Sequence, residues 1–194
     1  MAWFLHSATT RVTVAAVKLP LTLAEACVQM RMETGQDDAG ITSAVAAATA
    51  QIEEAFGVAM ITQTLATVTS YWPAVFTLSR GPVQSVASIK YKPAGATLVT
   101  LAGSEWAASL KSLPVMVSPA YGKTWPSATL DVADPIEVEY VAGFGLNETD
   151  VPATLKQATA ILAASLYANR ESGGMGDKKV AAAVISLLSN RRLW

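Results

Sequence analysis

The sequence predicts an α+β protein in which N- and C-terminal α-helices pack together around an inserted antiparallel β module. Two patterns in the chain of 194 residues support this fold class. Apolar residues recur at three- and four-residue intervals up to about residue 58 and again beyond residue 148, which is typical of amphipathic helices. Between them, short runs rich in threonine, valine and aromatic residues alternate with turn sequences such as "KPAG" and "DVADP". Helical segments therefore flank a β insertion within one structural domain.

These patterns divide the chain into four segments. Residues 1–18 form an extended N-terminal lead-in that contains one short candidate strand, "RVTVAAV". Residues 19–58 form a helical hairpin, and residues 59–147 form the antiparallel β module. Residues 148–194 contain the C-terminal helices and a docking tail.

The helical hairpin is predicted from capping residues as well as from periodicity. Thr22 and Glu25 have the spacing of a capping box at the start of the first helix, and Gly35 is its predicted end. The second helix begins near Asp38 and ends before Gly57, which suits the left-handed position after a helix. Its apolar stripe consists of Ile41, Ala44, Val45, Ala48, Ile52 and Phe56. The connection between the two helices is short, so they are expected to lie antiparallel.

Within the β module, "VQSVASIKY" and "PIEVEYV" are the clearest strands. In the second of these, apolar and acidic residues alternate with a period of two. Ile136, Val138 and Tyr140 therefore point to one side, which is predicted to be buried. Glu137 and Glu139 point to the other side, which is predicted to be exposed.

The C-terminal segment is predicted to contain two helices separated by a glycine-rich break. Pro152 lies near the first turn of the first helix, where proline is tolerated. Its apolar stripe consists of Leu155, Ala158, Leu162 and Leu166. The break "SGGMGD" is a candidate hinge, with glycines at Gly173, Gly174 and Gly176. The last helix carries on one side Val180, Val184, Leu187 and Leu188.

Composition excludes several classes of protein. The chain is 52% hydrophobic and only 15% charged, which suggests a surface that is covered in an assembly. A net charge of −1 gives no overall attraction to nucleic acid. The single cysteine, Cys27, cannot form an internal disulfide, which indicates a reducing compartment or a disulfide-free fold. No apolar run approaches the length of a membrane span, and the N-terminus lacks the basic region of a signal peptide, so a cytoplasmic, soluble protein is expected.

No constellation of catalytic, cofactor-binding or metal-binding residues is predicted. The one histidine, His6, has no partner for acid–base or metal chemistry nearby in the sequence, and Cys27 lies on the apolar face of a helix. Asp37 and Asp38 lack the spacing of a calcium loop, and capping of the second helix explains one of them more simply. The glycine motifs "GFG" and "GGMG" do not match phosphate-binding loops.

The chain ends on "LLSNRRLW", which brings arginine and tryptophan together at one terminus. Tryptophan buries a large apolar area, and chain ends fray unless a partner holds them. Arginine and tryptophan are both enriched at protein–protein hot spots. This segment is therefore a candidate docking element for another protein. The alternative is that Trp194 folds back onto the helices of its own chain.

A series of longer motifs follows in order along the chain. They are "LPLTLAEACVQMR" from residue 19, "IEEAFGVAMITQT" from residue 52, "LSRGPVQSVASIKY" from residue 78, "WP" at residues 125–126, "IEVEYVAGFG" from residue 136, "VPATLKQA" from residue 151 and "YANRE" from residue 167. Together they resemble the head–tail connector (adaptor) proteins of long-tailed phages and phage-derived gene transfer agents. The resemblance covers nearly the whole chain after residue 18.

The resemblance implies a structural role in virion assembly, with no enzymatic activity and no cofactor. Adaptors form a homo-oligomeric ring beneath the portal, expected here to be a dodecamer that matches the portal. The ring extends the DNA channel, lets DNA pass without sequence-specific binding, and joins the capsid to head-closure or tail proteins. The location implied is the neck of a virion or virion-like particle assembled in the bacterial cytoplasm, with no membrane contact. The resemblance assigns portal docking to Leu187, Leu188, Arg191, Arg192, Leu193 and Trp194.

Three other functions are compatible with parts of the sequence. A head-closure or tail-terminator subunit would share the ring but contact the tail. A carbohydrate-binding β module would use exposed rings of Trp72, Trp106 and Trp125. A hydrolase would use Glu137 and Glu139 in a cleft beside a third polar group.

Overall fold

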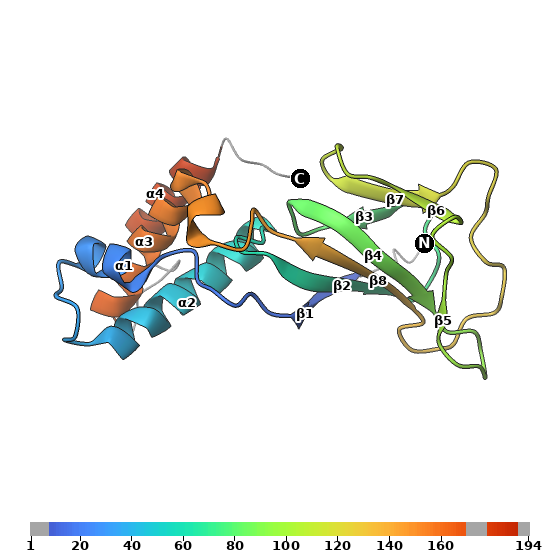
Figure 1. Cartoon of the computed structure of the whole chain (residues 1–194), viewed down its shortest axis with the longest axis horizontal. Helices are drawn as coiled ribbons and strands as arrows, with labels where there is room; N and C mark the ends of the chain where they lie inside the picture. Colours follow the sequence, from blue (N-terminus) through green and yellow to red (C-terminus); the bar gives the residue numbers. More distant parts are fainter. Residues whose placement is uncertain (1–7, 170–177, 190–194) are drawn as a thin grey trace. The chain divides into compact units, whose positions relative to one another are not determined.

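The computed structural model describes residues 8–169 and 178–189, which form two compact units. The helical unit contains residues 16–62 and the described residues from 143 onward. The β unit contains residues 8–15 and 63–142. Both helices and antiparallel sheets are present (Figure 1), so the predicted α+β class is confirmed.

The first helix, α1 (Leu23–Met30), begins as predicted and ends earlier than predicted. Thr22 and Glu25 form the complete capping box, each side chain binding the other residue's backbone N–H group. Arg31, rather than Gly35, ends the helix, because it adopts a left-handed conformation with φ of 56°. Its N–H donates to the carbonyls of Cys27 and Val28, which satisfies groups left open at the end of the helix.

The second helix, α2 (Asp38–Phe56), matches its prediction at both ends. The Asp37 side chain accepts a hydrogen bond from the N–H of Gly40, and Gly57 is left-handed at the C-terminal cap. Most of the predicted stripe is buried, while Phe56 is half-buried. Tyr167 donates a hydrogen bond of 2.9 Å to the second carboxylate oxygen of Asp37, so this cap also links α2 to the helix that carries Tyr167.

Two C-terminal helices complete the helical unit, after a short 3-10 turn, η1 (Glu148–Asp150). These are α3 (Ala153–Ala168) and α4 (Lys178–Leu188). Helix α3 packs against α1, α2 and α4, so the predicted packing of N- and C-terminal helices is confirmed. Within the described part of the chain, no helix is long and apolar enough to cross a membrane.

The β unit is built from an antiparallel five-stranded sheet and an antiparallel three-stranded sheet. The larger sheet has the order β1-β2-β8-β4-β5. Its strands are β1 (Thr9–Val14), β2 (Gln63–Thr69), β8 (Ile136–Ala142), β4 (Val83–Tyr91) and β5 (Val99–Thr100). The smaller sheet has the order β3-β7-β6, with strands β3 (Phe76–Leu78), β7 (Val115–Pro119) and β6 (Trp106–Ser109).

Burial alternates along β8 as the sequence predicts. Ile136, Val138 and Tyr140 are fully buried on one face of the sheet. Burial raises the pKa of the Tyr140 phenol, which favours its neutral form in the core. Glu137 and Glu139 lie on the opposite face, but they are half-buried rather than exposed, because neighbouring strands supply cations that lie across them.

The insertion begins and ends at adjacent backbone positions. In the β unit, Gln63 of β2 pairs with Ala142 of β8. In the helical unit, the N–H of Thr62 donates to the carbonyl of Gly145 over 2.8 Å. Gly143 lies between these two pairs with φ of +140°, a conformation that side chains rarely allow. A Cβ atom on Gly143 would lie 2.5 Å from the backbone of Thr62.

The first prediction is that Gly143→Ala strongly destabilises the protein. The substitution combines a disfavoured φ with a backbone clash that no rotamer relieves, so the expected loss is about 3 kcal/mol or more of unfolding free energy. Gly103→Ala is the matched control, because a Cβ there meets no atom within 4 Å. Urea denaturation measures both variants. Equal midpoints for the two variants would contradict the role given to Gly143.

The second prediction concerns acid stability. Burial of Glu25 opposes ionisation, but hydrogen bonds from Lys156 and Thr22 outweigh it and hold the pKa of Glu25 below its ordinary value of 4.5. The ionised carboxylate therefore stabilises the fold fully at pH values above 4.5. This stabilisation is lost as the pH falls through the lowered pKa of Glu25. Glu25→Gln should therefore cost about 0.5–1 kcal/mol at pH 7 and much less at about pH 3.

Denaturation of Glu25→Gln at the two pH values, beside the exposed-site control Glu54→Gln, tests this dependence. A deficit that stays constant between the two pH values would show that the ionised carboxylate is not the stabilising group.

Candidate functional site

The residues predicted to dock fall partly inside and partly outside the described structure. Leu188 is 3% exposed and Val184 is fully buried, so this side of α4 packs within the helical unit. Leu187 is half-buried. Arg191, Arg192, Leu193 and Trp194 lie outside the described residues, as do the predicted hinge glycines Gly173, Gly174 and Gly176. Of the six docking candidates, the structure therefore describes the two leucines only.

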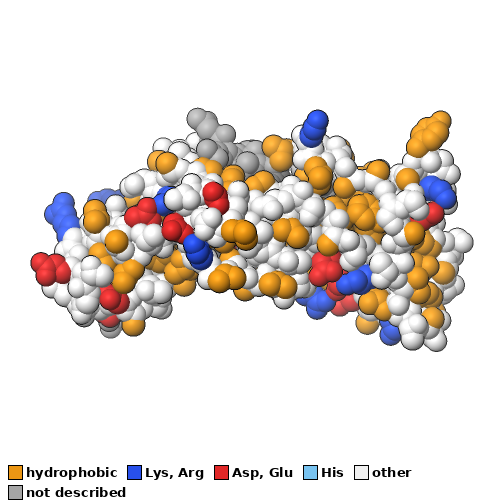
Figure 2. Space-filling view, in the orientation of Figure 1, with side chains coloured by type: hydrophobic (Ala, Val, Ile, Leu, Met, Phe, Trp, Pro, Cys, Tyr) orange, Lys and Arg blue, Asp and Glu red, His pale blue; other side chains and the backbone are white. Residues whose placement is uncertain are grey.

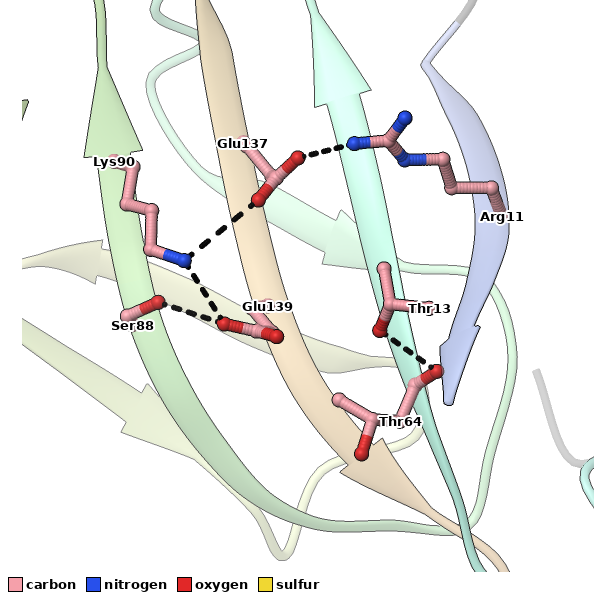
Figure 3. Close-up of polar contacts among 7 residues, drawn as sticks. All are labelled: Arg11, Thr13, Thr64, Ser88, Lys90, Glu137 and Glu139. Carbon is pink, nitrogen blue, oxygen red and sulfur yellow. Dashed lines mark hydrogen bonds and ion pairs between the residues drawn. The ribbon is translucent and has the colours of Figure 1, made fainter. Parts of the chain in front are cut away.

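The two acidic residues of β8 belong to an ion-pair ladder across one face of the five-stranded sheet (Figure 3). The Arg11 guanidinium of β1 donates to Glu137 over 2.6 Å. On the other side, the Lys90 ammonium of β4 lies 3.1 Å from a Glu139 oxygen and 3.9 Å from a Glu137 oxygen. Ser88 donates a further hydrogen bond of 3.2 Å to Glu139. Sequence alone did not reveal this ladder, because its members come from three separate strands.

The ladder weakens the hydrolase interpretation. Each carboxylate has a cationic partner, and two acidic and two basic side chains neutralise one another across the sheet. A glycosidase pair instead needs one carboxyl group kept protonated beside an ionised one. The arrangement is that of cross-strand ion pairs, with Lys90 of β4 directly opposite Glu137 of β8 and Arg11 of β1 reaching Glu137 across β2.

Two tryptophans of the β unit, Trp72 and Trp125, pack against other aromatic rings, while Trp106 of β6 is half-buried with its indole N–H enclosed. Trp72 and Trp125 stack with centroids 4.9 Å apart and an interplanar angle of 14°. Phe76 meets both rings edge-on, and Tyr91 packs against Trp72. The indole N–H of Trp125 donates to the carbonyl of Pro73. Because these rings join β3 to β4 and are buried or half-buried, they form a structural cluster rather than the exposed platform that carbohydrate binding requires.

The remaining candidate groups have structural roles where they are described. Cys27 is buried in α1, and Asp37 caps α2. Asp38 accepts a hydrogen bond from the N–H of Gly35. Within the residues that the structure describes, no three histidine, cysteine, aspartate or glutamate side chains are grouped to hold a metal ion. His6 lies outside the described residues.

A surface that the sequence did not reveal lies on the outer side of the three-stranded sheet. A hollow of about 450 Å³ lies on this side, lined by residues that point away from the core and by Ala108, whose cross-strand partner Val117 is buried. We call this surface the uncharged face, and its outward side chains are those of Val75, Thr77, Ala107, Ser109, Met116 and Ser118. The sequence pattern that could have indicated this surface is the alternation in "VMVSP", where Val115 and Val117 are buried and Met116 is exposed.

The structure is similar over nearly its whole length to chains of gene transfer agent (GTA) particles. A chain of the neck of an empty GTA particle with C6 symmetry is 25% identical, with a TM-score of 0.76, and the match covers 92% of this chain and 94% of that chain. A chain of the virion of a native GTA particle is 24% identical, with a TM-score of 0.73 and the same coverage. A chain of the neck of a native GTA particle with C12 symmetry is 24% identical, with a TM-score of 0.66, and the match covers 90% of this chain and 94% of that chain.

No protein-family model matches the sequence, and no curated protein matches it significantly. The predicted resemblance to connector proteins of the phage and GTA neck is nevertheless confirmed by these structural neighbours. The matched chains are components of GTA particles, which supports a structural neck protein. Two of the matched chains come from necks that are described with cyclic symmetry, C6 and C12.

The third prediction tests whether α4 is anchored by its buried leucine. Leu188→Ala removes a side chain that is 3% exposed, and Ile185→Ala removes one that is 50% exposed on the same helix. The expected losses of unfolding free energy are about 2–4 kcal/mol for Leu188→Ala and below about 1 kcal/mol for Ile185→Ala. Thermal unfolding followed by circular dichroism compares the two. Similar melting temperatures would mean that Leu188 is not held in the core.

Proposed function

We propose that the chain is the adaptor subunit of a phage or GTA neck, where copies form a ring beneath the portal, extend the DNA channel and join the capsid to the tail. The observation that supports this proposal most directly is the match to a GTA neck chain over 92% of this chain and 94% of that chain. The match includes the helical and the β segments together. The low fraction of charged residues, 15%, agrees with a subunit whose surface is covered by neighbours.

The match to a GTA neck chain is also compatible with a second neck function. A head-closure or tail-terminator subunit would also form a ring with cyclic symmetry, but it would bind tail components in place of the portal. The ordered series of adaptor-like motifs, from "LPLTLAEACVQMR" to "YANRE", favours the adaptor. We therefore propose the portal and the head-closure or tail proteins as partners, and a dodecamer as the state of the ring.

We propose that the C-terminal segment docks into the portal. Leu188 already has a packing environment within the helical unit, so its contribution is to anchor α4 at the base of the docking segment. Arg191, Arg192, Leu193 and Trp194 would supply the contacts, with Trp194 as the main apolar anchor. Gly173, Gly174 and Gly176 are proposed as the hinge that precedes α4.

The fourth prediction is that removal of residues 189–194 abolishes capture by the portal. A pull-down compares the full chain with this truncated chain, using the portal encoded beside it. The truncation leaves Leu187 and Leu188 in place, so α4 retains its buried contacts. A second variant, Trp194→Ala, tests the proposed anchor alone and should weaken capture about tenfold or more if it is a hot spot.

The outcomes separate the two neck functions. Equal capture of full and truncated chains would keep the adaptor role and move the contact away from the C-terminus. If neither chain binds the portal while both remain folded, and the full chain binds purified tail components, the head-closure interpretation replaces the adaptor.

A further inference from the structure

We propose that the uncharged face of the three-stranded sheet is an interface between neighbouring copies of this chain. The inference rests on the proposed ring, and it names the surface through which one subunit meets the next. Four observations support the inference. They are the register of the three-stranded sheet, the exposure of its outer side chains, the absence of charge among these side chains, and the cyclic symmetry described for the similar necks.

The register places the outer side chains in two rows. Thr77 of β3 is opposite Met116 of β7, which is opposite Ser109 of β6. In the next row, Ser118 of β7 is opposite Ala107 of β6. Val75, one residue before β3, lines the same hollow. Because opposite residues of an antiparallel pair lie on the same side of a sheet, these six side chains form one continuous surface.

This surface is open in the single chain. Met116 is 43% exposed and Val75 is 40% exposed, whereas Val115 and Val117, their neighbours on the inner side, are buried. Thr77, Ala107 and Ser109 are exposed as well. The side chains around Met116 are small, so the backbone of a partner can approach closely, and the hollow of about 450 Å³ provides space for its side chains.

The outer faces of the two sheets in the β unit differ in charge. The outer face of the five-stranded sheet contains Arg11, Lys90, Glu137 and Glu139, which neutralise one another. The hollow on the three-stranded sheet is lined entirely by uncharged residues. The solvent face of an antiparallel sheet ordinarily carries polar and charged side chains, whereas the centre of a protein interface is depleted of charge. The uncharged face therefore has the composition of an interface centre.

A second copy of the chain is the occupant that these observations favour. The similar chains come from GTA necks that are described with C6 and C12 symmetry, in which copies of a chain surround an axis. In a cyclic ring with more than two members, each copy uses two different surfaces, one toward each neighbour. The partner surface must lack charge where it covers the hollow, and a chain with only 15% charged residues supplies such surface readily.

The fifth prediction is that a charge on this face prevents ring formation without unfolding the subunit. Met116→Glu introduces a carboxylate that the ring would bury without a partner, so the assembled fraction should fall about tenfold or more. Thr100→Glu is the matched control, because Thr100 of β5 is exposed and lies opposite Lys90 on the outer face of the other sheet. It should leave the assembled fraction within about twofold of the unmodified chain, since a carboxylate that stays in water costs little.

The assembled fraction is measured for the full-length chain by native mass spectrometry and by electron microscopy of rings on purified portal. Thermal unfolding checks that both variants fold. A second measurement attaches an environment-sensitive fluorophore to Ser118→Cys. The buried Cys27 stays unlabelled, and this is checked with the unmodified chain. Assembly should shift the emission to shorter wavelength and slow quenching by iodide about tenfold, because the label becomes covered by the neighbour.

Each result bears on the proposal. Rings of normal size from Met116→Glu, with a Ser118 label that iodide still reaches, would overturn the interface while leaving the ring and the adaptor role intact. A label that becomes covered only when a tail component is added would assign the face to that partner and overturn the contact between copies. If the unmodified chain forms no ring, alone or on the portal, the proposed function fails and the interface fails with it.

Discussion

The constraint on which the rest of the fold depends is that the two ends of the β insertion lie side by side. Gln63 and Ala142 close the ladder between β2 and β8, and the Thr62 N–H bonds to the carbonyl of Gly145 just outside it. Only glycine fits at position 143, because the backbone of Thr62 occupies the space of a side chain. The helical unit can therefore be assembled from segments on both sides of the insertion, as the packing of α3 against α1 and α2 requires.

Features that depend on local sequence were predictable. The Thr22–Glu25 capping box, the Asp37 cap and the alternation along β8 each involve residues a few positions apart, so spacing alone reveals them. The predicted end of α1 at Gly35 was wrong, because Arg31 adopts a left-handed conformation that is more usual for glycine. Division of the β module into two sheets was not predicted, because strand pairing joins residues far apart in the sequence and depends on packing.

The same difference between local sequence features and long-range pairing explains which candidate surfaces could be predicted. The proposed docking segment could be predicted because arginine and tryptophan stand together in the sequence. The ion-pair ladder could not, because Arg11, Lys90 and the two glutamates become neighbours only through the order β1-β2-β8-β4. From the sequence, Glu137 and Glu139 were therefore interpreted as a candidate catalytic pair or as an exposed face. Their cationic partners could not be identified without the strand order. The uncharged face was hidden for the same reason, since its residues come from β3, β6 and β7.

Charge distribution connects these surfaces to assembly. The ladder contains two basic and two acidic side chains, so its sheet face carries little net charge despite four ionisable groups. A neutral, internally paired face exerts little long-range attraction on a polyanion, because the fields of adjacent opposite charges cancel within a Debye length. The uncharged face reaches neutrality in another way, by containing no ionisable group, and can therefore be buried without desolvating a charge. In the proposed ring, a neighbour covers the uncharged face, while the ladder face tolerates water because its charges are paired.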